Sequence, residues 1–160
     1  MARKVTTLFI RDTTINLLVM KGGKIEKWAS APLEPGLVSQ GLVVDEQQTA
    51  GKVKQIFKET RTQTDKVILG LSGHDSLYRI ITLPELPGAV LPEAVRREAQ
   101  RTIPTPLEHI YYSYQRIPSA KGECRVFLVT FPRNVVDALM RTLREAGVKP
   151  NVLELAPLAL

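Results

Sequence analysis

The chain has 160 residues, of which 44% are hydrophobic, and it carries a formal net charge of +6. This length and apolar content suffice to bury a core, in one domain or two small ones. The sequence contains no apolar run of about 18 residues and no secretory leader pattern, so we expect a cytoplasmic protein. Cys124 is the only cysteine, which excludes an intrachain disulfide. The positive net charge favours binding to acidic surfaces in general but does not identify a partner.

The first part of the chain predicts a three-stranded meander, a helix and a central strand. Its strand patterns lie at 5–10, 15–21, 24–30 and 66–71. Tight turns are expected at 12–14 and at Gly22-Gly23. Asp45 has the position of an N-cap, with Gln48 three residues later, ahead of an amphipathic helix. The last strand pattern is apolar almost throughout, which is typical of a strand covered on both faces.

The middle of the chain, 76–131, predicts a strand, a helix and two more strands. Residues 77–83 alternate as in a strand, and two prolines follow and end it. The next apolar positions recur at helical spacing, with Pro92 in the first turn. Strand patterns at 110–117 and 124–131 then flank a loop that suits a hairpin. A second long helix, 133–146, and a final strand, 151–155, complete the pattern.

This order of elements, with four short stretches in it, resembles the type IV pilus assembly protein PilM. The stretches are RIITLP at 79–84, REA at 97–99, IPTP at 103–106 and LREAGVKP at 143–150. PilM is similar to the actin-like cell-division protein FtsA and belongs with FtsA and MreB in the actin-like ATPase superfamily. Composition alone allows other α+β folds, so the resemblance decides the fold class.

The resemblance implies an α+β (α/β) fold, in which an actin-like, ribonuclease-H-like N-terminal subdomain carries an inserted strand-helix-strand-strand subdomain. We expect the first part of the actin-like subdomain at 1–75, the insert at 76–150 and a return strand at 151–160. The chain stops in apolar residues without a polar tail, whereas natural termini usually lie exposed. We therefore expect an N-terminal fragment that lacks the second actin-like half.

The resemblance also implies a phosphate-binding hairpin, and the sequence departs from its pattern. The family motif has an aspartate and a glycine where an alignment on Thr13 and Thr14 places Phe9 and Arg11. Glycine lets the backbone approach a phosphate, and the carboxylate holds water around the metal ion. We expect a structural hairpin without ATP. A remodelled nucleotide site built on Asp12, Thr13 and Thr14 is the alternative, and ATP with magnesium then belongs to complete family members.

The sequence gives weaker support for a metal site, a catalytic site or an RNA-binding surface. His74 and His109 have no second ligand at metal spacing, and His74-Asp75 beside two serines lacks an oxyanion hole, so we expect neither a metal site nor catalytic residues. Three tyrosines next to an arginine in one strand pattern offer a stacking platform for RNA: Tyr111, Tyr112 and Tyr114. Strand alternation divides them between two faces, so we expect half-buried sheet residues and no nucleic acid.

The resemblance implies a scaffold rather than an enzyme. We expect a cytoplasmic adaptor at the inner face of the cytoplasmic membrane, in the assembly platform of a type IV pilus or a related type II secretion machine. PilM-like proteins bind the N-terminal cytoplasmic tail of the membrane protein PilN in a cleft between the insert and the first subdomain. The residues expected near this peptide are Arg79, Ile81, Leu83, Val95 and Arg97. Other platform proteins are expected partners, and membrane association is expected only through partners. The alternatives are an ATP-binding actin-like ATPase and an FtsA-type cell-division protein.

Overall fold

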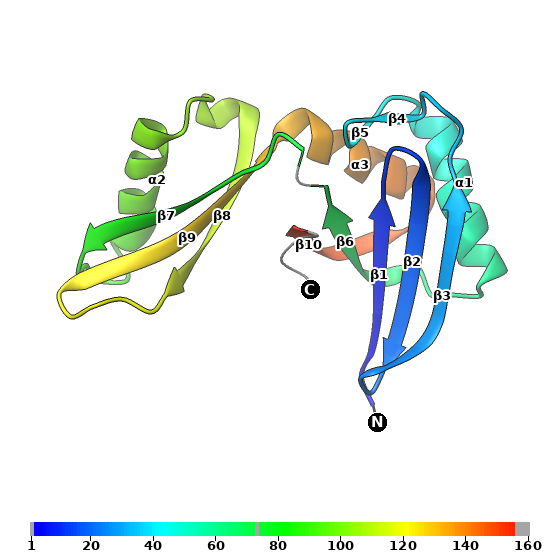
Figure 1. Ribbon diagram of the computed structural model, residues 1–160, viewed down its shortest axis with the longest axis horizontal. Coiled ribbons are helices and arrows are strands. Elements are labelled where there is room, and N and C mark those ends of the chain that lie inside the picture. The colour runs from blue at the N-terminus through cyan, green and yellow to red at the C-terminus, as the bar shows by residue number, and fades with distance from the viewer. Residues whose placement is uncertain (1, 73, 156–160) are drawn as a thin grey trace. The chain divides into compact units, whose positions relative to one another are not determined.

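A computed structural model describes residues 2–72 and 74–155 of the chain (Figure 1). The chain divides into two compact units. Unit 1 comprises residues 1–74 together with residues 135–160, and unit 2 comprises residues 75–134. Unit 2 is therefore inserted into the sequence of unit 1.

Unit 1 is built on a five-stranded sheet in the order β10-β6-β1-β2-β3. Its strands are β1 (Lys4–Ile10), β2 (Thr14–Lys21), β3 (Lys24–Pro32), β6 (Asp65–Leu71) and β10 (Lys149–Leu155). The first three form an antiparallel meander, as predicted, and β6 runs parallel to both β1 and β10. The helices of this unit are α1 (Glu46–Glu59) and α3 (Arg133–Glu145).

The core of unit 1 follows the alternation of its strands. Every second residue is buried from Thr6 to Ile10 in β1 and from Ile15 to Val19 in β2. Helix α1 presents the apolar side predicted for it, and its first turn is capped by Asp45, whose Oδ1 accepts the Gln48 N–H at 2.9 Å. At the other end of α1, Lys27 Nζ donates to the Thr60 carbonyl at 2.9 Å. Lysine at this position offsets the helix dipole and satisfies a terminal carbonyl.

A short hairpin, β4 (Val38–Ser39) and β5 (Leu42–Val43), precedes α1. The sequence indicates only a short apolar passage here. Gln40 and Gly41 form the turn with φ angles of 50° and 79°. Two positive φ angles match the primed turns that join tight hairpins, and glycine adopts them without strain.

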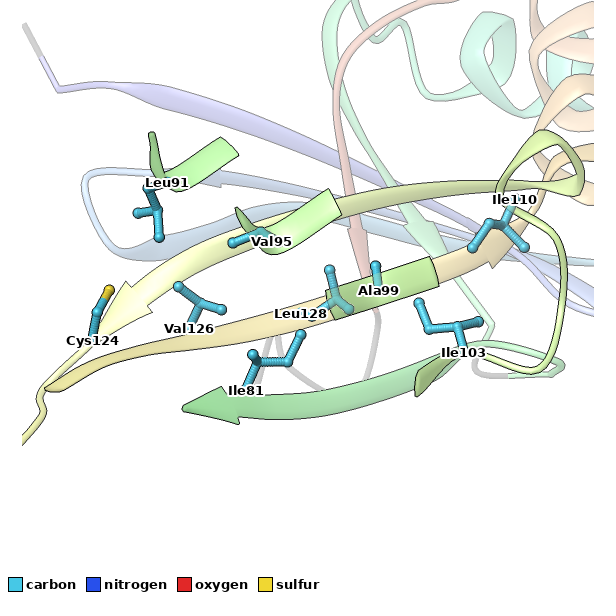
Figure 2. Close-up of a cluster of buried hydrophobic side chains, with 9 residues drawn as sticks. All are labelled: Ile81, Leu91, Val95, Ala99, Ile103, Ile110, Cys124, Val126 and Leu128. Carbon is cyan, nitrogen blue, oxygen red and sulfur yellow. The ribbon is translucent and has the colours of Figure 1, made fainter. Parts of the chain in front are cut away.

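Unit 2 is a three-stranded antiparallel sheet in the order β7-β9-β8, with one helix on one face. Its elements are β7 (Leu77–Pro84), α2 (Leu91–Thr102), the short 3-10 helix η1 (Leu107–His109), β8 (Ile110–Ile117) and β9 (Glu123–Pro132). The strand-helix-strand-strand order is the predicted one. Figure 2 shows the core between α2 and the sheet, formed by Ile81, Leu91, Val95, Ala99, Ile103, Ile110, Cys124, Val126 and Leu128.

The second boundary of the insert differs from the prediction, because residues 135–150 group with unit 1. Two interactions account for this. The Arg141 guanidinium donates to the Glu46 carboxylate at 2.7 and 3.0 Å, which ties α3 to the start of α1. The strand that follows α3 pairs with β6 in parallel. From Val135 onward, helix α3 is therefore part of unit 1 rather than of the insert.

Candidate functional site

The turn between β1 and β2 is the predicted phosphate hairpin, and Asp12 lies in it. The Arg11 N–H donates to the Thr14 carbonyl at 2.8 Å and closes the turn. The two Asp12 carboxylate oxygens accept the N–H groups of Gln40 and Gly41 at 2.8 and 2.9 Å. Asp12 thus holds the β4–β5 turn, which is the structural role that short acidic side chains commonly have beside turns.

The side chains of Phe9 and Arg11, at the two positions where the sequence departs from the family motif, lie close to each other. The Phe9 ring lies against Gly70 of β6, such that a Cβ on Gly70 would be 3.4 Å from the ring. The Arg11 guanidinium carbon lies 5.7 Å from the centroid of the same ring, within cation–π range. An aromatic ring and a fixed positive charge therefore stand where the motif has a carboxylate and a glycine.

Thr13 and Thr14 are the other two residues of the alternative nucleotide site. Thr13 is exposed, and its carbonyl accepts the Leu33 N–H at 2.9 Å. Thr14 is half-buried as the first residue of β2. The three residues of the alternative nucleotide site are thus adjacent in one turn, and loss of ATP binding stays a prediction.

The metal-site and RNA-binding alternatives depend on the histidines and on three tyrosines. Among the described residues, no group of three or more histidine, cysteine, aspartate or glutamate side chains is placed to hold a metal ion. Tyr112 and Tyr114 pack against the core of unit 2. Tyr111 lies on the opposite face, where the Arg133 guanidinium carbon is 4.4 Å from its ring centroid. The three rings do not share a face, as the alternation predicts.

The five residues predicted to lie near a partner peptide divide into two groups. Ile81 and Val95 are 5% and 0% exposed and belong to the unit 2 core, so their side chains offer a peptide no surface. An inward position on a strand and one on the facing helix pack together for the same apolar reason. Arg79 and Arg97 are exposed and Leu83 is half-buried. The predicted contact surface is therefore reduced to these three.

The charges on α2 are largely paired with each other. Glu93 accepts Arg96 Nε at 2.9 Å and Arg97 Nε at 3.0 Å. These two hydrogen bonds, that from Arg96 first, lower the pKa of Glu93 from its usual 4.5 to about 2. Arg101 pairs with Glu98 in the same way. Among the described residues, no ion pair involves Arg79, so its charge is open to an incoming carboxylate.

A hollow of about 560 Å³ lies within unit 2, at the end of the sheet where β7 begins. Leu77, Ile103 and Ile110 provide its apolar lining, and Thr105 and His109 are among its polar lining residues. Sequence reasoning did not find this hollow. Its one signal is the turn 103–106 with two prolines, which cannot continue the helix and so leaves room beside the sheet.

The fold and these surfaces define a class of protein. A mixed sheet in the order β10-β6-β1-β2-β3 with an inserted strand-helix-strand-strand unit is the pattern of an actin-like subdomain. The family model for the type IV pilus assembly protein PilM matches residues 13–160, and the chain belongs to this family. A search of curated proteins finds no match.

Solved structures agree with this assignment. The chain is similar to a chain in the "PilM-PilN type IV pilus biogenesis complex", with 28% identity, a TM-score of 0.84 and coverage of 97% of this chain and 48% of the other. The chain thus spans about half the length of that relative.

Two further likenesses show the fold alone. One is the cytoplasmic domain of EpsL, an inner-membrane component of the type II secretion system of Vibrio cholerae, with 14% identity, a TM-score of 0.62 and coverage of 95% and 57%. The other is the ethanolamine utilization protein EutJ from Carboxydothermus hydrogenoformans, with 13% identity, a TM-score of 0.52 and coverage of 98% and 38%. Within the described residues, no helix has the length and apolar character needed to cross a bilayer.

Proposed function

We propose that this chain acts as an adaptor in the inner-membrane platform of a type IV pilus or a related type II secretion machine. Its partner would be the N-terminal cytoplasmic tail of a PilN-like membrane protein. The observation that carries the proposal is the similarity, over 97% of the chain, to a chain of a PilM-PilN complex. Membrane association would then come through this partner and other platform proteins.

The proposal makes the chain a binding module and not an enzyme. The Asp12 carboxylate accepts two backbone N–H groups, and the Arg11 guanidinium lies over the Phe9 ring. A phosphate needs close backbone N–H groups, and Mg²⁺ needs oxygen ligands and their water shell. These contacts support a chain that carries no nucleotide and does no hydrolysis.

The direct test is calorimetric titration of the 160-residue chain with a synthetic peptide of the PilN-like tail from the same genome. We expect saturable binding, and none with a scrambled peptide of equal composition. Arg79→Gln should weaken binding, whereas Arg144→Gln, an exposed position in unit 1, should not. Absence of binding by both the folded chain and the complete protein would overturn the proposal.

The rival function is nucleotide binding by an actin-like ATPase. It predicts a fluorescence change when a labelled ATP analogue is added to the complete protein with magnesium. The adaptor proposal predicts no such change in the 160-residue chain. An FtsA-type protein is a further rival, and it differs in that its complete chain should end in an amphipathic membrane-targeting helix.

A further inference from the structure

The antiparallel meander formed by β1, β2 and β3 has one face toward the core of unit 1 and one face toward solvent. Buried positions alternate with partly exposed ones along β1 and β2, so the core uses only every second residue. On β3 the side chains of Ile25 and Trp28 are 64% and 73% exposed. Two large apolar side chains this exposed on one strand indicate an interaction surface.

The strand register gathers further side chains around these two. Thr7 of β1, Leu18 of β2 and Trp28 of β3 lie opposite one another across the three strands. Together with Ile25 they line an open recess of about 500 Å³. No charged residue is among the described residues that line it. The recess therefore offers an apolar place for a ligand on the solvent face of the meander.

Basic residues surround the end of the meander where β1 begins and the β2–β3 turn lies. Across the strand ends Lys4 pairs with Lys21, and Lys21 pairs with Lys24. All three are exposed, and so is Arg3, whose carbonyl is hydrogen-bonded to the β2–β3 turn. Glu26 is the single acidic residue of the β2–β3 hairpin, and it is paired with Lys4 Nζ at 2.9 Å. The apolar recess thus has a positively charged rim at one end.

We propose that this recess and its basic rim bind the surface of an anionic lipid bilayer. Trp28 and Ile25 would enter the boundary between headgroups and acyl chains, where tryptophan is enriched. The rim lysines would contact the headgroup phosphates, because anionic lipids attract basic residues within a Debye length of the surface. The inference goes beyond the proposed function, since it adds a direct lipid contact to the association expected through partners.

The charge of the rim favours a bilayer over a second copy of this chain. A two-fold contact uses the same surface on both copies, so it would combine two positive rims without an acidic counterpart. An anionic bilayer supplies the opposite charge along the whole rim. Lysine also suits a lipid surface, because its apolar stem lies along apolar groups while its ammonium group stays in water.

Vesicle binding by the 160-residue chain, followed through Trp28 fluorescence, tests the contact. Trp28 is the only tryptophan of this chain, so its emission reports on the recess directly. With vesicles of phosphatidylglycerol and phosphatidylcholine in equal parts we expect co-sedimentation and a blue shift, and neither with phosphatidylcholine alone. High salt should weaken the binding, because it screens the lysines. Absence of binding to the anionic vesicles, or binding without a change in Trp28 emission, would overturn the inference.

Single substitutions locate the contact. Lys24→Gln should lower partitioning onto the anionic vesicles about fivefold, as expected for one basic residue near a charged membrane surface. Lys121→Gln removes the same charge at an exposed position of unit 2, and it should bind as the unmutated chain does. Ile25→Ser should weaken binding with an unchanged circular dichroism spectrum, because its side chain is not part of the core. Equal binding by Lys24→Gln and Lys121→Gln would overturn the inference.

Two further measurements decide between a bilayer and other occupants of the recess. The complete protein should also bind the anionic vesicles, and Ile25→Ser should weaken that binding. Absence of binding by the complete protein would assign the recess to another segment of that protein. Self-association of the 160-residue chain that Ile25→Ser abolishes would assign it to a second copy, and either result would overturn the inference. None of these assays contains the tail peptide, so their failure leaves the proposed function intact.

Discussion

The Asp12 carboxylate is hydrogen-bonded to the Gly41 backbone, with 2.9 Å between Oδ1 and the amide nitrogen. This bond joins the β1–β2 turn to the β4–β5 turn, which lies 29 residues further along the chain. The same carboxylate accepts the Gln40 N–H. The predicted phosphate hairpin is thus tied through Asp12 to the β4–β5 turn that precedes α1.

Removal of the Asp12 carboxylate should therefore destabilise unit 1. We expect Asp12→Ala to lower the free energy of unfolding by about 2 kcal/mol, because two backbone N–H groups lose a charged acceptor. Urea denaturation followed by circular dichroism measures this. Thr13→Ala, at the exposed neighbouring position, is the matched control and should change stability by less than about 0.5 kcal/mol. Equal stability of the two variants would show that the Asp12 bonds contribute nothing.

Gly41 should tolerate a side chain less well than Gly36. Both residues have positive φ, 79° and 90°, so alanine costs about 1–2 kcal/mol at either position. At Gly41 the added methyl would also collide with the Ser72 hydroxyl, whereas at Gly36 it meets open space. We expect Gly41→Ala to have the lower thermal midpoint of the two. Equal midpoints would mean that Ser72 moves aside without cost, and the reverse order would contradict the prediction.

The sequence predicted the elements whose signals are local. The Asp45 cap, the glycine turn between β2 and β3 and the 77–83 alternation each depend on residues a few positions apart. The β4–β5 hairpin was not predicted, since two-residue strands carry no periodicity and Gln40 is an unusual residue at positive φ. The assignment of α3 to unit 1 depends on Arg141 and Glu46, which are 95 residues apart.

The candidate site was predictable only in part, for a related reason. Ile81 and Val95 are predicted to contact a partner because they lie on the first strand and helix of the insert. Alternation on β7 and helical spacing on α2 instead direct both side chains into the core. Arg79 lies on the same strand and is exposed. The recess beside Trp28 was not visible in the sequence, since the register of three strands brings its residues together.

Val95 should matter for stability and not for contact with a partner. Its side chain is fully buried, so Val95→Ala should remove about 2 kcal/mol of stability from unit 2 through a cavity and lost apolar burial. Peptide affinity measured at low temperature, where the variant remains folded, should be unchanged. Arg79→Gln should show the opposite pattern, with normal stability and weaker binding. Weaker binding by folded Val95→Ala would return Val95 to the contact surface.

Thr49 and Thr142 form a matched pair for the effect of a buried hydroxyl. Both residues are fully buried in helices of unit 1. Thr142 Oγ1 donates to the Ala138 carbonyl at 2.7 Å, whereas Thr49 Oγ1 has no hydrogen-bond partner among the described residues. We expect Thr49→Val to raise the free energy of unfolding by about 1 kcal/mol, and Thr142→Val not to raise it. A stability loss in Thr49→Val would indicate that its hydroxyl is satisfied in solution.

Glu93 should titrate far below an ordinary glutamate. Its hydrogen bonds from Arg96 and Arg97 lower its pKa from 4.5 to about 2. Because the pKa of the folded state is the lower one, the stabilisation is complete above about 4.5 and is lost as the pH falls toward 2. Carbon-13 NMR of the side-chain carboxyl follows this titration directly.

Arginine variants separate the two causes of this shift. Arg96→Gln should raise the Glu93 midpoint toward 4.5, and Arg97→Gln should raise it by less, because the Arg96 hydrogen bond is the larger cause. Arg101→Gln is the control, since Arg101 pairs with Glu98 and should leave Glu93 unchanged. High salt should raise the midpoint in the unmutated chain, because exposed ion pairs are screened. A Glu93 midpoint near 4.5 at low salt would show that the α2 pairs do not persist in solution, and would leave Arg97 as free as Arg79 to meet a partner.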